Sequence, residues 1–331
     1  MIPSDKLGRE LRDLRISLTD RCNFRCNFCM PEGQEYEFFK REEILSFEEI
    51  ARVVRIAKRL GIKKVRLTGG EPLLRRHLEK LVGMIREEVE DIALTTNGFL
   101  LKEKIKDLSL AGLKRVTVSL PSLRDDRLSY IVGKDVKVSQ ILESIQRAVE
   151  VGVLVKVNVC VVKGINEDEI VDFIEFFRPL GIEVRFIEFM DVGNLNGWSL
   201  EKVFSARDIL QAVSNRYMVQ PLGKAKKGET ANRFSLEDGY AFGIIASITE
   251  PFCGDCNRLR LTADGKLLTC LFASNGYDLK KLLRSGVEDE QIESFIRAIW
   301  ENRVDRYSEE RLELLKKGRK PKKIEMFKIG G

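Results

Sequence analysis

The sequence has a single histidine among its 331 residues, and this residue, His77, is far from the first cysteine-rich segment. Zinc sites usually combine a C-x2-C pair with a second pair of cysteine or histidine ligands. The scarcity of histidine therefore argues against a mixed cysteine–histidine zinc site.

Long apolar runs are also missing. No window approaches the ~20 uncharged apolar residues of a membrane span. The first residues, Met-Ile-Pro-Ser-Asp-Lys, lack the basic stretch and apolar stretch of a signal peptide. Hydrophobic residues make up 44% of the chain and charged residues 33%, as in soluble globular enzymes. We therefore expect a cytoplasmic enzyme with no membrane segment.

The cysteines do not come in an even number. There are seven, which in a long chain argues against a disulfide framework. Six of them form two sets of three: Cys22, Cys26 and Cys29, and Cys253, Cys256 and Cys270. The seventh, Cys160, sits in an apolar alternation over residues 155–162, which predicts a buried core thiol.

The first set has the spacing C-x3-C-x2-C, with Phe28 just before the last cysteine. Three thiolates within eight residues can hold one metal cluster and leave a coordination position open for a small molecule. The alternatives are a three-cysteine zinc knuckle and a loop of unpaired thiols. The spacing also differs from ferredoxin runs. The motif therefore favours chemistry at an open iron over a plain electron carrier.

The second set again offers three thiolates and not four, so a zinc ribbon would lack a ligand. We therefore favour a second iron–sulfur cluster in which one iron has an open coordination position. The two sets could instead share one six-ligand site, but their different spacings favour two clusters.

Charge alone says little about partners. The net charge is +6, which does not by itself imply nucleic acid binding. A basic run over residues 316–323 is expected to be a solvated surface segment. The alternatives are nucleic acid binding and attraction of a polyanionic small molecule.

The chain reads as an α/β fold of six strand–helix units. Predicted strands cover residues 14–19, 64–68, 92–96, 115–120, 153–162 and 183–189, and predicted helices cover 47–60, 78–88, 102–110, 138–151, 169–177 and 206–215. This alternation indicates a parallel sheet, either open or a partial barrel. After residue 217 the pattern changes, so we expect a core over 1–217 and a smaller module over 218–331, with a charged helix over 288–302.

Polar residues follow the predicted strands, where sites of α/β folds lie. Gly69-Gly70-Glu71-Pro72 follows the second strand and lacks a phosphate-loop pattern. Its glycines would allow close backbone approach by a ligand, and Glu71 could order the loop. The alternative is an ordinary turn.

Cations recur at positions that should face one cavity. Arg258 and Arg260 are two apart on an extended segment and would project to the same side. Arg15, Arg66 and Lys156 alternate with apolar residues in predicted strands. Buried cations need an anionic partner, so these five suggest a highly charged ligand such as a triphosphate. The alternative is a set of separate structural ion pairs.

The first cysteine motif with the later Gly-Gly-Glu-Pro is similar to the radical S-adenosylmethionine (SAM) superfamily. Over nearly the whole chain the sequence resembles the GTP 3′,8-cyclase family of molybdenum cofactor biosynthesis. The motifs that carry the resemblance are Asp20 to Cys26 and Cys29-Met30-Pro31, Thr68 to Pro72, Thr95 to Gly98, Cys253 to Arg260, Cys270 and the final Gly330-Gly331.

The resemblance implies a partial (β/α)6 TIM-like barrel of the radical SAM type, a C-terminal iron–sulfur extension and two [4Fe-4S] clusters. The first cluster would bind SAM and the second the guanine of GTP. Positions matching SAM contacts are Phe28, Gly70, Ser119 and Met190. Positions matching GTP contacts are Arg15, Arg66, Thr95, Lys156, Arg258, Leu259 and Arg260. The Gly330-Gly331 tail would reach into the active site.

Two residues depart from the family pattern. Phe28 stands where tyrosine is usual, and Pro121 stands where aspartate is common. The implied reaction joins ribose C3′ to guanine C8 of GTP and needs no side chain as acid or base.

The implied partners are GTP, an external one-electron donor and a downstream cyclic pyranopterin monophosphate synthase, without nucleic acid or membrane and with a homodimer allowed. Two alternatives are another radical SAM enzyme with an auxiliary cluster, such as a peptide-modifying maturase, and a non-catalytic metal-binding module.

Overall fold

The computed structural model describes residues 1–226, 228–319 and 321–330. Within these ranges the strands form one twelve-stranded sheet in the order β12-β11-β10-β1-β2-β3-β4-β5-β6-β9-β8-β7. The strands are β1 Asp13–Ser17, β2 Lys64–Thr68, β3 Asp91–Thr96, β4 Arg115–Ser119, β5 Leu154–Val161, β6 Glu183–Glu188, β7 Val219–Gly223, β8 Asn232–Leu236, β9 Ala241–Ile245, β10 Arg258–Leu261, β11 Lys266–Leu268 and β12 Tyr277–Asp278.

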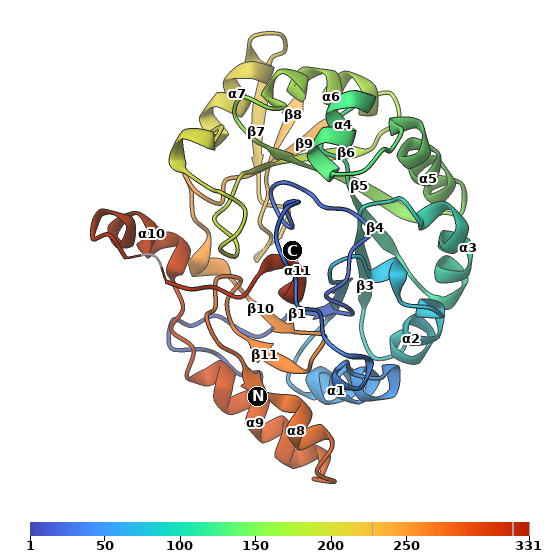
Figure 1. Ribbon diagram of the computed structural model, residues 1–331, viewed down its shortest axis with the longest axis vertical. Coiled ribbons are helices and arrows are strands. Elements are labelled where there is room, and N and C mark those ends of the chain that lie inside the picture. The colour runs from blue at the N-terminus through green and yellow to red at the C-terminus, as the bar shows by residue number, and fades with distance from the viewer. Residues whose placement is uncertain (227, 320, 331) are drawn as a thin grey trace.

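The helices lie mainly on the outer face of this curved sheet (Figure 1). They are α1 Phe47–Arg59, α2 Leu78–Ile85, α3 Leu101–Ala111, α4 Asp125–Val132, α5 Val138–Glu150, α6 Ile170–Phe177, α7 Ala206–Ser214, α8 Leu279–Leu283, α9 Asp289–Glu301, α10 Tyr307–Lys316 and α11 Met326–Ile329. No helix in the described ranges has both the length and the apolar character of a transmembrane span.

Strands β1 to β6 are parallel and follow one another around a partial barrel, as the strand–helix alternation predicts. The six predicted strands all form, with ends that agree within a residue or two. Helix α4, which lies between β4 and α5, was not among the predicted elements. It has only eight residues, and its buried side chains are Leu128, Ile131 and Val132, so its apolar pattern covers a single helical repeat.

The sheet continues beyond the six units at both edges. Strand β10 pairs parallel with β1, and β9 pairs parallel with β6. Each then leads into antiparallel strands, β11 and β12 at one edge and β8 and β7 at the other. The residues after 217 therefore extend the same sheet. No pairing among the described residues joins β7 to β12, so the barrel stays open. The division of the chain at residue 217 stays a prediction.

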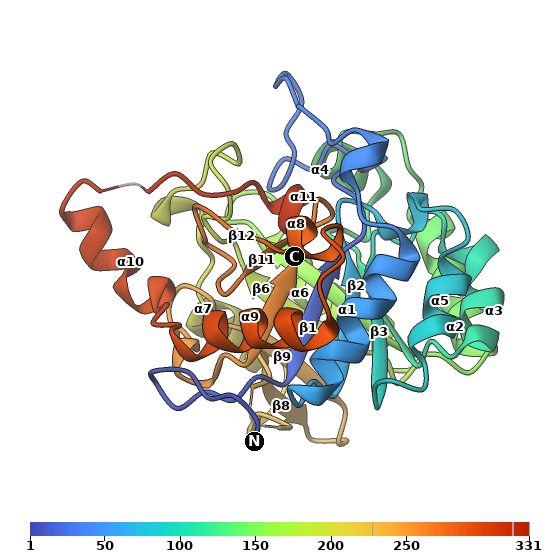
Figure 2. The same cartoon turned by 90° about the horizontal axis from the view of Figure 1, so that it is seen from below.

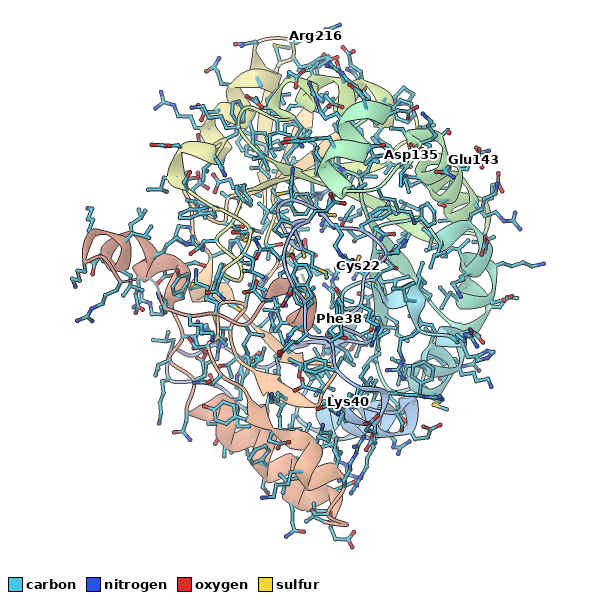
Figure 3. All side chains as sticks on the ribbon, viewed as in Figure 1. Cys22, Phe38, Lys40, Asp135, Glu143 and Arg216 are labelled. Atoms are coloured by element: carbon cyan, nitrogen blue, oxygen red, sulfur yellow. The ribbon has the colours of Figure 1, made fainter. Side chains whose placement is uncertain are left out.

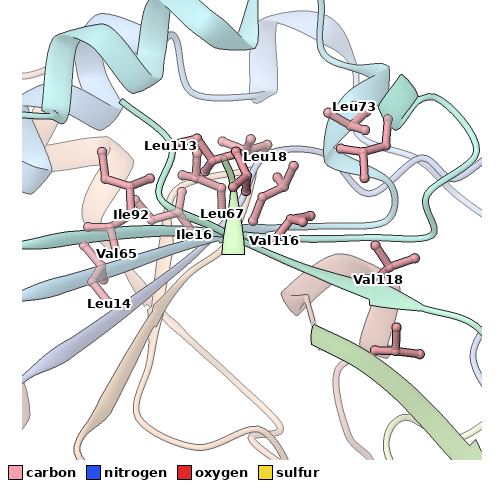
Figure 4. Close-up of a cluster of buried hydrophobic side chains, with 14 of the residues drawn as sticks. Leu14, Ile16, Leu18, Val65, Leu67, Leu73, Ile92, Leu113, Val116 and Val118 are labelled. Carbon is pink, nitrogen blue, oxygen red and sulfur yellow. The ribbon is translucent and has the colours of Figure 1, made fainter. Parts of the chain in front are cut away.

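The hydrophobic core fills the space between the sheet and the outer helices. Figure 4 shows part of it, where Leu14, Ile16, Val65 and Leu67 meet side chains from β3, β4 and the neighbouring loops. Strand side chains alternate between faces, so these apolar residues lie on the outer face. Burial of such side chains stabilises the fold by roughly 25 cal/mol for each Å² of apolar surface.

Helix α1 begins where the sequence predicts. The Ser46 side chain accepts a hydrogen bond from the Glu49 amide, and Glu49 reaches back to the Ser46 amide, which forms a capping box. Its buried residues recur at helical spacing and face β1 and β2.

The C-terminal segment returns to the barrel. Helix α10 projects from the body of the molecule in both orthogonal views, while α11 lies near the middle of the barrel opening (Figure 1, Figure 2). The chain therefore crosses from the periphery to the centre within the last residues.

Candidate functional site

All six predicted ligand cysteines line one cavity inside the partial barrel. Cys22 lies near the barrel axis, whereas Asp135, Glu143 and Arg216 lie on the periphery (Figure 3). The first set follows the carboxyl end of β1. Strand β10 is parallel to β1, and Asp13 at the start of β1 pairs with Arg258 at the start of β10. Cys253 and Cys256 come before Arg258 in the chain, so they lie at the amino end of these two strands. The two sets therefore flank the inner face of β1 and β10.

The first cysteine loop is shaped by its own backbone. The amides of Cys29 and Met30 both donate to the Cys26 carbonyl, at 3.0 and 2.8 Å. The Phe24 amide donates to Cys22 Sγ at 3.4 Å. Burial raises the pKa of Cys22 to about 11. The loop thus presents three cysteines to the cavity in a largely apolar setting.

The Gly-Gly-Glu-Pro turn supports this loop from β2. A Cβ at Gly70 would lie 2.2 Å from the Arg21 carbonyl oxygen, so the close approach requires glycine. Glu71 is buried and accepts hydrogen bonds from the Thr96 hydroxyl, the Asn97 amide and the Leu73 amide, at 2.7, 2.8 and 3.0 Å. Glu71 therefore orders the turn.

The predicted SAM contacts Phe28, Gly70, Ser119 and Met190 all line the cavity. Pro121, which departs from the family pattern, also lines it, and its carbonyl accepts a hydrogen bond from Asn166 Nδ2 at 2.8 Å. The four predicted contacts come from different strand ends, and the fold brings them together.

The five predicted cations also line the cavity: Arg15, Arg66, Lys156, Arg258 and Arg260. Strand register places Arg15 beside both Arg66 and Arg260. Burial and neighbouring guanidinium groups lower the pKa of Arg15 to about 9, and burial lowers that of Arg66 to about 10. Like charges on adjacent strands destabilise a sheet, so this wall fits an anionic ligand.

Individual atoms of this wall are left without partners among the described residues. The Nε atoms of Arg15, Arg66 and Arg185 are buried and make no hydrogen bond. Buried guanidinium donors without acceptors are unfavourable unless a ligand supplies oxygen atoms. Lys156 differs, because its ammonium pairs with Glu183 at 2.7 Å. The ion-pair alternative therefore holds for Lys156 and not for the unpartnered guanidinium atoms.

The remaining predicted GTP contacts have different surroundings. Thr95 lines the cavity and accepts a hydrogen bond from Arg66 Nη1 at 3.0 Å. The side chain of Leu259 lies in the hydrophobic core, on the face opposite the arginines that flank it. Gly330 is buried, and its carbonyl accepts from Arg260 Nη1 at 2.7 Å. Gly331 lies outside the described residues.

Four cavity cations were not predicted from the sequence: Arg303, which follows α9, and three strand residues, Lys64, Arg115 and Arg185. The three strand residues share one pattern. Each alternates with apolar residues in its strand, as Arg15 and Arg66 do. A search for charged residues that alternate with apolar ones in the predicted strands would have identified them.

The second cysteine set has cationic surroundings. Arg303 Nη2 donates to Cys256 Sγ at 3.2 Å, and Arg9 Nη1 donates to the Cys253 carbonyl at 2.8 Å. Burial alone would raise the pKa of Cys256, but Arg258 and Arg303 outweigh it and lower the pKa to about 6. Three cysteines with adjacent cations match the thiolate ligation of an iron–sulfur cluster.

One expectation from the sequence was wrong, and another is confirmed in part. Cys160 lines the cavity and is only partly buried, because β5 turns it to the same face as Lys156. The basic run over 316–323 is exposed at Lys316, Lys317, Arg319 and Lys322, as expected, but Lys323 is buried against Asp191, which is distant in sequence. Lys320 lies outside the described residues.

The partial barrel with a three-cysteine loop after its first strand is the arrangement of radical SAM enzymes. Residues 16–177 match the Radical SAM superfamily, and residues 182–309 match the family described as Molybdenum Cofactor Synthesis C. The chain is 51% identical over 329 residues to the GTP 3′,8-cyclase of Aquifex aeolicus (strain VF5), covering 99% of each protein. It therefore belongs to the GTP 3′,8-cyclase family.

Other relatives agree. The GTP 3′,8-cyclase of Staphylococcus saprophyticus is 45% identical over 335 residues, covering 99% of this chain and 98% of the relative. Among solved structures, Streptococcus suis SuiB bound to S-adenosylmethionine has a TM-score of 0.60 at 16% identity. That likeness covers 87% of this chain and 68% of SuiB, and it shows the fold.

Proposed function

We propose that this chain is a GTP 3′,8-cyclase, a radical SAM enzyme that converts GTP to (8S)-3′,8-cyclo-7,8-dihydroguanosine 5′-triphosphate at the first step of molybdenum cofactor biosynthesis. The observation that carries the proposal is the wall of buried arginines between two three-cysteine sets in one cavity. Full-length similarity to GTP 3′,8-cyclases supports it.

The residues present fit two [4Fe-4S] clusters and SAM. Cys22, Cys26 and Cys29 would hold the first cluster, and Cys253, Cys256 and Cys270 the second, each with three thiolates. A reduced cluster with SAM supplies the 5′-deoxyadenosyl radical chemistry that abstracts hydrogen from a substrate. Phe28, Gly70, Ser119 and Met190 would line the SAM side.

The protein's own contribution is positioning. Arg15, Arg66, Arg258 and Arg260 present guanidinium groups that bind phosphate oxygens. The cluster at the amino end of β10 would receive the guanine, so the nucleotide would lie along the inner face of β1 and β10. Thr95 and Lys156 extend this wall, and the backbone of Leu259 spaces its two flanking arginines.

The test is anaerobic incubation of iron–sulfur-reconstituted protein with SAM, dithionite and GTP. We expect about eight iron atoms per chain, together with 5′-deoxyadenosine and cyclised nucleotide in equal amounts. Omission of GTP should abolish the cyclised product. Formation of 5′-deoxyadenosine without consumption of GTP would contradict the substrate assignment.

The setting of the reaction is part of the proposal. An external one-electron donor would supply the electron that the first cluster needs, and the product would pass to a cyclic pyranopterin monophosphate synthase. The enzyme acts in the cytoplasm. A homodimer stays a prediction, which light scattering of the purified protein would check.

A further inference from the structure

The C-terminal segment is held across the barrel opening by a buried ion cluster. Asp191, which follows β6 and Met190, contacts Lys323 Nζ at 2.5 Å, the Tyr307 hydroxyl at 2.6 Å and Arg311 Nε at 2.7 Å. Arg311 is fully buried, and Asp191 and Lys323 are nearly so. We call Asp191, Tyr307, Arg311 and Lys323 the tail anchor.

The tail anchor contains two cations and one carboxylate. Aromatic rings supply further stabilisation: Lys323 Nζ lies 4.6 Å from the Tyr307 ring centre, and the Arg311 guanidinium lies 4.9 Å from that of Phe272. These contacts do not replace the carboxylate, because a buried cation needs an opposite charge. Lys323 lies beside exposed Lys322, so loss of the Asp191 charge would favour its release into water.

Backbone contacts extend the anchor along the tail, which we define as residues 321–330. The Asn194 side chain donates to the Lys323 carbonyl at 2.6 Å and accepts from the Lys323 amide at 3.1 Å. The Ile324 amide donates to the Ala273 carbonyl at 3.0 Å. The tail therefore lies against the loop after β6 and the loop after Cys270.

The far end of the tail reaches the site. Met326 lines the cavity, and Phe327 packs between Tyr36 and Phe38, with ring centres 5.3 and 6.1 Å away. The Gly330 carbonyl accepts the hydrogen bond from Arg260 Nη1. Since only a few residues separate Lys323 from Gly330, the anchor fixes where the tail meets Arg260.

We propose that Asp191 is a positioning residue whose carboxylate fixes the tail across the cavity, so that the tail in turn fixes Arg260 for the nucleotide. The tail touches both sides of the cavity: the Gly330 carbonyl accepts from Arg260 on the nucleotide side, and a Cβ at Gly330 would lie 2.3 Å from Thr68 Cγ2, beside the Gly-Gly-Glu-Pro turn. The catalytic readouts of this inference rest on the proposed function, but its structural readout does not.

The experiment compares Asp191→Asn, Lys323→Met and the double variant with the wild-type holoenzyme. Hydrogen–deuterium exchange is followed in the peptide that contains the Lys323 and Ile324 amides. We expect exchange at least about tenfold faster in each variant, because a released tail would let the Lys323 and Ile324 amides separate from their acceptors, Asn194 Oδ1 and the Ala273 carbonyl. The KM for GTP should rise about tenfold with kcat unchanged, since the proposed role of Arg260 is to bind the nucleotide.

Coupling between Asp191 and Lys323 distinguishes the positioning role of Asp191 from a general loss of stability. If Asp191 and Lys323 act as one unit, the double variant should be no worse than either single variant. Asp238→Asn is the matched control, because Asp238 forms an exposed ion pair with Arg178 far from the tail; it should change none of these quantities. Additive effects, or unchanged exchange of the tail, would overturn the proposal. A fall in kcat with an unchanged KM for GTP would also overturn it.

A second variant displaces the tail while Asp191 stays intact. Gly193 has φ +71°, and a Cβ there would lie 2.2 Å from Glu325 Oε2. The Glu325 carboxylate is held by the Asn194 amide at 3.0 Å, and the Glu325 Cα atom would lie 3.3 Å from the added Cβ. Gly193→Ala, which is also strained at this φ, should therefore displace Glu325, loosen the tail and raise the KM for GTP even if Asp191→Asn does not fold. Unaltered exchange and KM in Gly193→Ala would count against the anchor. A wild-type enzyme that does not consume GTP would refute the proposed function, while the exchange comparison would still test the anchor.

Discussion

The two cysteine sets face one cavity but have opposite electrostatic surroundings. Near the first set the buried charged group is a carboxylate, Glu71, and burial raises the pKa of Cys22 to about 11. Near the second set the buried groups are guanidinium ions, and Arg258 and Arg303 lower the pKa of Cys256 to about 6 despite burial, whereas burial raises the pKa of Cys270 to about 11. Burial raises the pKa of all three thiols in the first set, so the cationic setting of the second set shows at Cys256.

This difference matches two roles. An apolar setting excludes water and quenching groups around a radical. A cationic setting attracts and orients an anionic nucleotide and offsets the negative charge of thiolates. We therefore propose that the second cysteine set is part of the substrate site and that the first belongs to the SAM side.

The largest expected effect comes from removing one cysteine of each set. Cys26→Ser should abolish 5′-deoxyadenosine formation, because the SAM side loses a ligand. Cys256→Ser should keep SAM cleavage in the presence of dithionite and abolish the cyclised product, since only the nucleotide side is damaged. Anaerobic product analysis by chromatography, with iron counting, checks both. Equal loss of 5′-deoxyadenosine in the two variants would mean that the sets have no separate roles.

The next largest effect concerns the cationic wall between the sets. Arg258→Ala with Arg260→Ala should weaken GTP binding at least about a hundredfold, because two charge-assisted contacts are lost. SAM binding should stay within about twofold of wild type. Calorimetry with each ligand measures the two affinities. The matched control is Arg178→Ala, whose cation is on the surface; the phosphate role fails if both affinities match the control.

The positions of this wall could be predicted from sequence because strands alternate their faces. Arg15, Arg66 and Lys156 stand out against apolar neighbours, and the cysteine motifs fix which end of the barrel matters. The six strands and six helices of the repeated units could also be predicted, from the spacing of apolar residues and from the glycines that follow helices.

Other parts of the site could not be predicted in this way. Arg303 contacts Cys256 from the turn after α9, and Lys323 contacts Asp191 across 132 positions of sequence. Neither residue lies in an alternating strand; Arg303 stands between Glu301 and Asp305, and Lys323 is one cation of a basic run. Only tertiary packing distinguishes Lys323 from the exposed Lys322. The tail anchor therefore emerges from structure alone.

A smaller effect should separate the thiols themselves in the metal-free protein. Thiolates and not thiols react with iodoacetamide. With a pKa of about 6, Cys256 should reach its full rate near pH 7, whereas with a pKa of about 11 Cys22 should still gain rate at pH 9. Peptide mass spectrometry at several pH values measures each rate. Arg303→Gln should move the Cys256 profile to higher pH; identical profiles for the two cysteines would remove the electrostatic contrast.

The last test concerns the carboxylate on the apolar side. Burial raises the pKa of Glu71 from 4.5 to about 7, although its hydrogen bonds oppose this. Between these values the folded state binds more protons than the unfolded state, so the free energy of unfolding falls as pH rises, by about 3 kcal/mol in all.

Glu71→Gln removes the titration and should flatten this dependence between pH 5 and 7. Urea unfolding of the metal-free protein at stepped pH measures the slope, with the exposed Glu313→Gln as control. If the free energy of unfolding changed with pH equally in Glu71→Gln and in the wild type, Glu71 would make no pH-dependent contribution to stability. The contrast between the two cysteine sets would then depend on the guanidinium groups alone.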